Sequence, residues 1–354
     1  MKLYIDIVGG CNLRCPSCPV GNSSNEATPR GLMAPELLDK ICAKAVREFR
    51  PSLIDLYNWS EPFLHPRLAE MIRVVKRHGL AVNISSNLNI SRNMDKVLAM
   101  EPREFKVSVS GFDQENYGKT HKRGQIDRVK ANMARLADLK TRLGSSTKLK
   151  VGFHRYLGNH EDEAKMKAYA EGLGFSFETT WAFFMPAEKY VALGQGGLRD
   201  ERLNDADREI IDRLALDPLQ AIEIAKKHKN QPCRLLTRSV SLTHTGDVTL
   251  CCSTYDTNRF VVGNFVDEPF DALQKLREQH RFCRECMEQG GHVLGVVEVP
   301  AFQRAAVARV RSYFPQLETR KLVKLGKKKE LLPRVWRQTR NVIRNIATYA
   351  LTWR

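Results

Sequence analysis

The chain lacks any run of apolar residues that approaches the length of a membrane-spanning helix. We also expect no secretory leader, because a single lysine at the start is followed by a short apolar run that Asp6 interrupts. No G-x-G-x-x-G sequence opens the first expected helix, which removes the main motif for nicotinamide binding. We therefore expect a cytoplasmic protein that is not a nicotinamide-dependent dehydrogenase.

Disulfides are not expected either, although the chain of 354 residues has nine cysteines. Their number is odd, no leader precedes them, and most fall at spacings typical of metal ligands, which favours a reducing compartment. Cys42 is set apart because it lies on the apolar stripe of a helix expected after Pro35, and we interpret it as a core residue. A hydrophobic content of 42% and a charged content of 27% are typical of a soluble globular protein.

The net charge of +17 is concentrated at the C-terminal end. Residues 301–354 contain fourteen Lys and Arg but only two Glu, so they carry +12 and the rest of the chain carries +5. Beyond residue 334 an apolar helical face opposes Arg337, Arg340 and Arg344. Such a helix can pack on the body, dock a partner, bind a nucleic acid backbone or lie on an anionic membrane. Apart from simple packing, we favour contact with a membrane surface through residues 301–354, which would make the protein peripheral there.

A cysteine loop begins ten residues from the start, with Cys11, Cys15 and Cys18 in a C-x3-C-x2-C pattern. It follows an apolar run over residues 3–8, which predicts a strand, and two glycines that allow a sharp turn. Three thiolates on one compact loop can hold three irons of a four-iron cluster and leave the fourth iron open. Zinc is the alternative, because Cys283 and Cys286 offer a second C-x2-C pair. The open position favours chemistry over a purely structural site.

Short apolar segments alternate with helical segments along the first half of the chain, which is the pattern of parallel βα units. Six strands are expected, over residues 3–8, 53–57, 81–85, 105–109, 149–153 and 175–179. Six such units fit a curved, barrel-like sheet, whose functional residues lie at the carboxyl ends of the strands. The residues at or just after these strand ends are the cysteine loop, Ser60, Glu61, Ser85, Ser86, Asn87, Ser108 and Ser110. We therefore predict one site at this rim.

The stretch over residues 7–19, which contains the three cysteines, resembles the signature of radical S-adenosylmethionine (SAM) enzymes, and the resemblance extends over about residues 1–180. It implies a [4Fe–4S] cluster on Cys11, Cys15 and Cys18, whose open iron binds the amino and carboxylate groups of SAM. Reductive cleavage of SAM then gives a 5′-deoxyadenosyl radical that removes a hydrogen from a substrate. Ser17 departs from the pattern, because the family usually has an aromatic residue there that packs against adenine.

The same resemblance implies cofactor-binding residues at the rim. Ser60-Glu61-Pro62 is similar to the family's G-E-P motif, whose backbone and acidic side chain meet the ammonium of SAM, and a carboxylate suits a cationic amine. The alternative for Glu61 is a helix-start residue before Pro62. The other residues implied are Ser86 and Asn87, in the place of a T-N-G-like segment, and Ser108 and Ser110, at positions that often contact the ribose or carboxylate of SAM.

A second cysteine group follows a charged connector with amphipathic segments at residues 205–214 and 218–228. It consists of Cys233, a hairpin over residues 238–243 and 248–252 that ends with Cys251, a helix over residues 271–279, and a knuckle with Cys283 and Cys286. Four cysteines can complete the coordination of a zinc ion or of a [4Fe–4S] cluster, and their spacing alone does not distinguish the two. The spacing of Cys233, Gly246 and Cys251 resembles the SPASM/Twitch extensions of radical SAM enzymes, which implies one auxiliary [4Fe–4S] cluster of the Twitch type.

Two neighbours of this group need a separate interpretation. Consecutive strand residues point to opposite faces, so one of Cys251 and Cys252 is the ligand, and we choose Cys251 with Cys252 as the alternative. His292 stands alone in a glycine-rich turn, where a histidine is more often solvated than a ligand.

These patterns predict an α/β protein, with a partial (β/α)6 TIM-like barrel, a small C-terminal hairpin-plus-helix iron–sulfur domain and a basic helical tail. The expected boundaries are residues 1–185 for the radical SAM core, 186–230 for the helical connector, 231–295 for the Twitch/SPASM-like domain and 296–354 for the tail.

The predicted activity is an oxidoreductase-type radical SAM reaction in the barrel mouth, with an external low-potential electron donor. The auxiliary cluster accepts an electron from the substrate radical or binds the substrate. A small-molecule or sugar-like substrate is favoured over a peptide, because peptide maturases usually carry an N-terminal recognition domain and the first cysteine here is residue 11. An alcohol oxidation needs a base, for which His154 and Arg155 are the candidates. The alternatives are a SPASM-type peptide maturase and a non-catalytic, metal-stapled protein that binds membrane or nucleic acid.

Overall fold

The computed structural model describes residues 1–22, 30–196 and 203–317, and Met1–Gln316 form one compact unit. Its sheet has the strand order β6-β5-β4-β3-β2-β1-β7-β8-β9. The strands are β1 (Lys2–Ile5), β2 (Leu53–Asp55), β3 (Val82–Ser86), β4 (Glu104–Val109), β5 (Lys148–Arg155), β6 (Ser176–Trp181), β7 (Ser239–Leu242), β8 (Asp247–Thr249) and β9 (Val261–Asn264). The longer helices are α2 (Pro35–Glu48), α3 (Leu68–Arg77), α6 (Ile126–Arg142), α7 (His160–Gly172), α13 (Phe270–Gln279) and α15 (Pro300–Tyr313). The shorter ones are α1 (Pro19–Asn22), η1 (Pro62–Leu64), α4 (Met94–Ala99), α5 (Gln114–Thr120), α8 (Ala187–Gly194), α9 (Asp205–Arg213), α10 (Pro218–Lys226), α11 (Arg234–Arg238), α12 (Thr257–Phe260), α14 (Arg281–Glu288) and η3 (Gly291–Val293).

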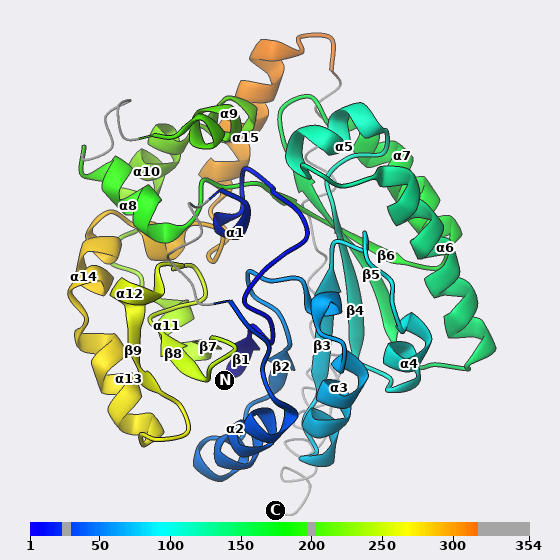
Figure 1. Cartoon of the computed structure of the whole chain (residues 1–354). Helices are drawn as coiled ribbons and strands as arrows, with labels where there is room; N and C mark the ends of the chain where they lie inside the picture. Colours follow the sequence, from blue (N-terminus) through cyan, green and yellow to red (C-terminus); the bar gives the residue numbers. More distant parts are fainter. Residues whose placement is uncertain (23–29, 197–202, 318–354) are drawn as a thin grey trace, which may run out of the picture. The chain divides into compact units, whose positions relative to one another are not determined.

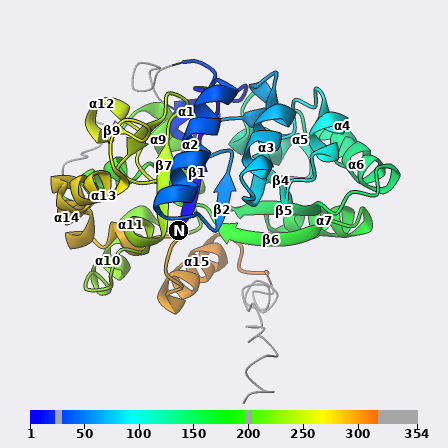
Figure 2. The same cartoon turned by 90° about the horizontal axis from the view of Figure 1, so that it is seen from below.

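Strands β1 to β6 run parallel and form the curved, TIM-like part of the sheet (Figure 1). Their apolar side chains occupy alternate positions, because successive residues of a strand point to opposite faces. In β4, Phe105 and Val107 are fully buried in the same apolar core as Met133 of α6. One face of the strands is therefore sealed by helices, whereas α15 lies on the other side of the sheet (Figure 2).

The face opposite the helices carries charged and polar side chains. Lys2 of β1 forms an ion pair with the fully buried Asp55 of β2. On the neighbouring strands, Lys150 lies 2.6 Å from a carboxylate oxygen of Glu104. Lys2, Glu104 and Lys150 lie toward the amino ends of their strands, whereas functional side chains in such sheets are expected at the carboxyl ends.

Strand β1 lies at the centre of the sheet, because it pairs in parallel with β2 on one side and with β7 on the other. Strands β8 and β9 then continue the sheet in antiparallel fashion. Helices α13 and α14 lie beside this extension (Figure 1). The second cysteine group is therefore built on the same sheet as the first.

The predicted α/β, partial-barrel class is confirmed, and the six predicted strands correspond to β1–β6 with small shifts at their ends. Several shorter elements were not predicted, among them α4, α5 and β9. The prediction that Cys283 and Cys286 form a knuckle is wrong, because both lie on α14. The domain boundaries stay a prediction.

The predicted C-terminal tail is described only as far as residue 317, so the basic face beyond residue 334 lies outside the described residues. Its first part is the helix α15, which Arg309 ties to Asp217 of α10 at 2.8 Å. Among the helices that the structure describes, none combines the length and the apolar character needed to cross a membrane.

Candidate active site

The three cysteines of the N-terminal loop line one cavity of about 510 Å³ at the carboxyl ends of the strands. The loop is held at several points: Cys18 N–H donates to the Cys15 carbonyl at 3.1 Å, and Arg14 N–H donates to the Lys122 carbonyl at 3.0 Å. Gly21 packs so closely that an added Cβ would lie 2.3 Å from the Cys15 carbonyl oxygen. Backbone contacts therefore fix the course of the loop.

Burial raises the pKa of all three thiols, to about 12 for Cys11 and about 11 for Cys18. The protons must leave when a metal binds, because the thiolate is the ligand. Among the described residues, no group of His, Cys, Asp or Glu is arranged to hold a single metal ion. Three sulfur donors that line one cavity fit a four-iron cluster with one open iron.

The loop after β2 is organised by the carboxylate of Asp6. Asp6 accepts hydrogen bonds from the N–H groups of Asn58, Trp59 and Ser60 at 2.9–3.1 Å, and from the Ser60 hydroxyl at 2.5 Å. Asn58 also donates to the Cys252 carbonyl at 3.2 Å. The backbone around Ser60 is thus fixed against both β1 and the second cysteine group.

Glu61 lies under this loop, lines the cavity and is 2% exposed. It accepts hydrogen bonds from Phe63 N–H at 3.0 Å, from the Ser86 hydroxyl at 2.8 Å and from Asn87 N–H at 2.8 Å. The first bond makes Glu61 the N-cap of η1, which is the alternative that we considered from the sequence. Burial nevertheless raises its pKa to about 7, so the carboxyl group would gain from a cationic partner.

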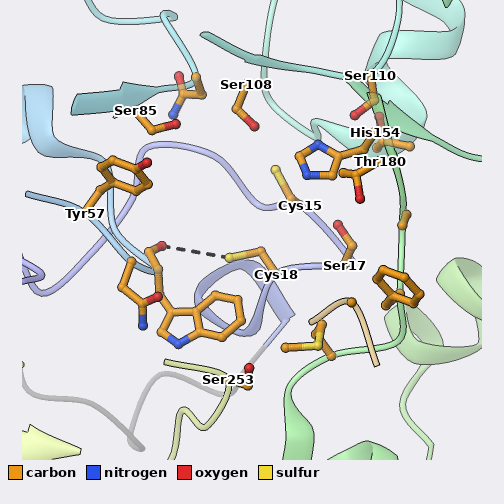
Figure 3. A pocket seen from close by; sticks show the side chains of 18 of the residues that line it. Cys15, Ser17, Cys18, Tyr57, Ser85, Ser108, Ser110, His154, Thr180 and Ser253 are labelled. Carbon is orange, nitrogen blue, oxygen red and sulfur yellow. Dashed lines mark hydrogen bonds between the residues drawn. The ribbon is translucent and has the colours of Figure 1, made fainter. Parts of the chain in front are cut away.

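The predicted hydroxyl residues gather around the same cavity (Figure 3). Those that line it are Ser60, Ser85, Ser86, Asn87, Ser108 and Ser110. Asn87 is closest to the cysteine loop, since its Nδ2 lies 3.6 Å from Cys11 Sγ and 3.0 Å from the Asn12 side-chain oxygen. The hydroxyl of Ser110 is buried and has no hydrogen-bond partner, so it is available to a bound molecule.

His154 lines the cavity beside Thr180 (Figure 3). Burial lowers its pKa to about 4, and the nearby charge of Lys106 adds to this effect. His121, which we did not predict, lines the same cavity and stacks on the ring of Tyr117 with a centroid distance of 4.6 Å. Burial lowers the pKa of His121 to about 3. Both imidazoles are therefore neutral near pH 7, because burial disfavours their charged forms.

The prediction that Arg155 acts as a base is wrong. Its guanidinium group does not line the cavity, and two of its nitrogens donate to the Glu163 carboxylate at 2.6 and 2.7 Å. Both side chains are 4% exposed. Arg155 therefore belongs to a buried ion pair between β5 and α7, and a guanidinium has no acceptor capacity.

Ser17 contacts an aromatic residue from another part of the fold. Tyr156, directly after β5, lines the cavity and donates its hydroxyl hydrogen to Ser17 Oγ at 3.1 Å. The ring is nearly buried, with 6% of its surface exposed. An aromatic side chain therefore lies next to Ser17, although it comes from the residue after β5 and not from the cysteine loop.

A second, smaller pocket of about 40 Å³ brings together Cys233, Cys251, Cys283 and Cys286. Cys283 and Cys286 are one helical turn apart on α14, which places both sulfurs on one side of the helix. Cys252 lines the large cavity instead. Four sulfur donors around one small pocket fit a closed cluster with no open position.

His292 is not solvated, contrary to our interpretation of the sequence. It is 3% exposed and lines the small pocket, and its Nε2 lies 2.7 Å from the Gln231 carbonyl oxygen. The glycines around His292 do not indicate that its side chain is exposed. The turn is packed here, because Gly291 lies directly against Cys286.

A thin wall separates the two pockets. Leu235 and Ser253 line both of them, and Cys251 and Cys252 face opposite sides. Trp59 also reaches this wall, since its indole N–H donates to the Thr254 carbonyl at 3.1 Å. The two cysteine groups are therefore adjacent, although more than 200 residues separate them in the sequence.

Comparisons with known proteins bear on this arrangement. No protein-family model matches the chain. The tungsten-containing aldehyde ferredoxin oxidoreductase cofactor-modifying protein of Pyrococcus furiosus is 36% identical over 85 residues, which are 24% of this chain and 23% of that protein. The match thus spans less than a quarter of that relative's length.

Solved structures match over most of the chain at low identity. Streptococcus suis SuiB bound to S-adenosylmethionine has a TM-score of 0.53 and 13% identity, and the match covers 81% of this chain and 71% of that one. The anSMEcpe protein with bound AdoMet has a TM-score of 0.55 and 14% identity, and the match covers 89% of this chain and 97% of that one. The chain therefore has the fold of these two SAM-bound proteins.

Proposed function

We propose that this protein is a radical SAM enzyme. The observation that carries the proposal is that Cys11, Cys15 and Cys18 share one cavity with the buried carboxyl group of Glu61 and with hydroxyl groups from β3 and β4. A [4Fe–4S] cluster on the three cysteines would supply the electron for cleavage of SAM, and hydrogen abstraction from a substrate would follow. The likeness to two SAM-bound proteins of the same fold supports this reading.

Different residues around the cavity bind different parts of SAM. Glu61 accepts the ammonium group, on a backbone that Asp6 holds in place. Ser86, Asn87, Ser108 and Ser110 offer hydrogen bonds to the carboxylate and ribose groups. The ring of Tyr156 packs against adenine in place of the aromatic residue that Ser17 replaces.

The second cysteine group holds an auxiliary [4Fe–4S] cluster. Its four sulfur ligands are Cys233, Cys251, Cys283 and Cys286. Because four cysteines would close such a cluster and Leu235 and Ser253 stand between it and the cavity, the cluster would supply an electron acceptor for the substrate radical and would not be a substrate-binding site. An external low-potential donor supplies the electron for SAM cleavage.

The substrate is a small molecule with hydroxyl groups. The cavity of about 510 Å³ must hold SAM as well, which leaves little room. Among the described residues that line it, there is no Lys or Arg, and Glu61 is the single carboxylic acid. An oxidation also needs a base, and His154 and His121 are the imidazoles that line the cavity.

A peptide substrate is the second candidate. It is favoured by one observation, that SuiB bound to a precursor peptide, SuiA, has the same fold with a TM-score of 0.55. The two candidates differ in what stimulates SAM cleavage. We expect the small-molecule filtrate of a cell extract to increase 5′-deoxyadenosine formation, and stimulation by its peptide fraction alone would favour the second candidate.

The enzyme itself is tested with anaerobically purified protein. We expect about eight irons per chain, in two four-iron clusters, and 5′-deoxyadenosine from SAM under reduction. A Cys15→Ala variant should lose about half of the iron and all SAM cleavage. Bound zinc with no SAM cleavage would instead favour the non-catalytic, metal-stapled protein.

A further inference from the structure

Arg277 of α13 is the largest fully buried side chain in the described part of the chain, with 0% of its surface exposed. Its three hydrogen bonds go to neutral oxygens. Nε donates to the Leu250 carbonyl at 3.0 Å, one terminal nitrogen donates to the Ser239 carbonyl at 2.8 Å, and the other donates to the Gln274 side chain at 2.7 Å. No carboxylate among the described residues forms an ion pair with it.

This arrangement is costly for an ordinary arginine. Removing a cation from water costs several kcal/mol unless an opposite charge lies nearby. The chain itself offers a contrast, because the equally buried Arg155 has the carboxylate of Glu163 against it. The positive charge of Arg277 therefore needs a negative partner that the carboxylates of the protein do not supply.

The charged forms of the second cysteine group provide that partner. Arg277 contacts the second cysteine group at two points. It donates a hydrogen bond to the carbonyl of Leu250, the residue before Cys251, and its own carbonyl oxygen lies 3.4 Å from Cys283 Sγ. Burial lowers the pKa of Arg277, whereas thiolates at Cys251 and Cys283 would oppose this shift. As neutral thiols, the four cysteines leave the charge uncompensated, and as thiolates on a cluster they compensate it.

We propose that Arg277 is the internal counter-cation of the auxiliary cluster and raises its reduction potential. This inference rests on the proposed auxiliary cluster. Reduction adds one negative charge to the cluster, and a fixed cation nearby stabilises the reduced form. Arg277 is a positioning residue and not a ligand, and it favours the role of the cluster as an electron acceptor.

The test measures the reduction potential of the auxiliary cluster by redox titration followed by electron paramagnetic resonance. Cys11→Ala, Cys15→Ala and Cys18→Ala together remove the other cluster from the signal. In this background, Arg277→Gln removes the charge and Arg277→Lys keeps it, although both lose hydrogen bonds to Leu250, Ser239 and Gln274. Arg281→Gln is the matched control, because Arg281 lies on α14 with an 86% exposed side chain.

We expect Arg277→Gln to lower the reduced fraction at least tenfold at a fixed potential, a shift of about 59 mV for one electron, or to prevent cluster assembly. Arg277→Lys and Arg281→Gln should stay near the parent. Equal effects of Gln and Lys at position 277, or no effect of either, would overturn the proposal and leave Arg277 a structural residue. The iron content of the parent protein tests the auxiliary cluster separately from the role of Arg277. A parent with no second cluster would refute the proposed auxiliary site itself.

Discussion

Glu61 combines a buried carboxyl group with a pKa raised by burial to about 7. Below that pH the group is neutral and does not attract an ammonium ion, and above it the carboxylate does. SAM affinity should therefore rise as pH increases through 7, with proton release on binding near that pH. Calorimetry in two buffers of different ionisation enthalpy measures both quantities.

The control for this prediction is Glu61→Gln, which keeps the shape of the side chain but cannot ionise. Its SAM affinity should be weaker above pH 7 and independent of pH. A pH dependence that survives in the variant would mean that another group titrates, and Glu61 would then be only the N-cap of η1.

Cys251 and Cys252 differ in surroundings although they are neighbours in the chain. Cys251 lines the small pocket with three other cysteines, and Cys252 lines the large cavity. We expect Cys251→Ala to lose about four irons and Cys252→Ala to lose none, because one side chain is a ligand and the other is not. Iron analysis of both variants tests this prediction. Iron loss from Cys252→Ala but not from Cys251→Ala would make Cys252 the ligand.

Sequence patterns predicted the site residues unevenly, for physical reasons. The rim residues Glu61 and Ser108 could be placed, because parallel strands end at one edge of a sheet. His121 could not, since it follows a short helix with no clear periodicity, and its burial depends on stacking with Tyr117. The contact of Tyr156 with Ser17 joins two distant segments, which no local pattern reveals.

At the scale of the elements, the pair of Arg155 and Glu163 ties β5 to α7 inside the protein. Removing one partner leaves a buried charge without compensation, so Glu163→Gln should lower the free energy of unfolding by about 3–5 kcal/mol. Chemical denaturation measures this loss. Replacing both residues, with Arg155→Met and Glu163→Leu, should recover much of it.

If the double replacement unfolds as readily as the single one, the pair contributes more than charge compensation. SAM cleavage by folded Glu163→Gln protein should continue, because neither residue lines the cavity. Loss of SAM cleavage without loss of stability would return Arg155 to the list of catalytic candidates.

The strands could be predicted more easily than the helices around the second cysteine group. Strand β5 alternates buried and partly exposed residues along its whole length, which is a strong local signal. Helix α14 has only eight residues with two cysteines among charged ones, so the C-x2-C spacing suggested a knuckle. In a helix that spacing equals almost one turn, and the sequence alone does not separate the two cases.

At the scale of the whole molecule, the basic C-terminal segment can be tested apart from the compact unit Met1–Gln316. Ending the chain at Gln316 removes eleven Lys and Arg and two Glu. We expect the shorter chain to fold and keep its iron, because the contacts described above lie within residues 1–316. Binding to anionic vesicles should be lost, since each basic residue near such a surface contributes about 1 kcal/mol.

Sedimentation with vesicles at low and high salt is the measurement, and single-stranded RNA is the comparison. The full chain should bind vesicles more weakly at high salt, because salt screens these charges. Equal vesicle binding by both chains would place the contact elsewhere, and binding to RNA alone would replace the membrane proposal.

The central position of β1 has a consequence for how the protein is made. This strand and the cysteine loop are synthesised shortly before β2, but β7 is synthesised only after β3 to β6. Until then one edge of β1 remains open to mispairing. The nascent protein therefore contains Cys11, Cys15 and Cys18 well before β7 supports their strand, so iron insertion should follow the synthesis of β7.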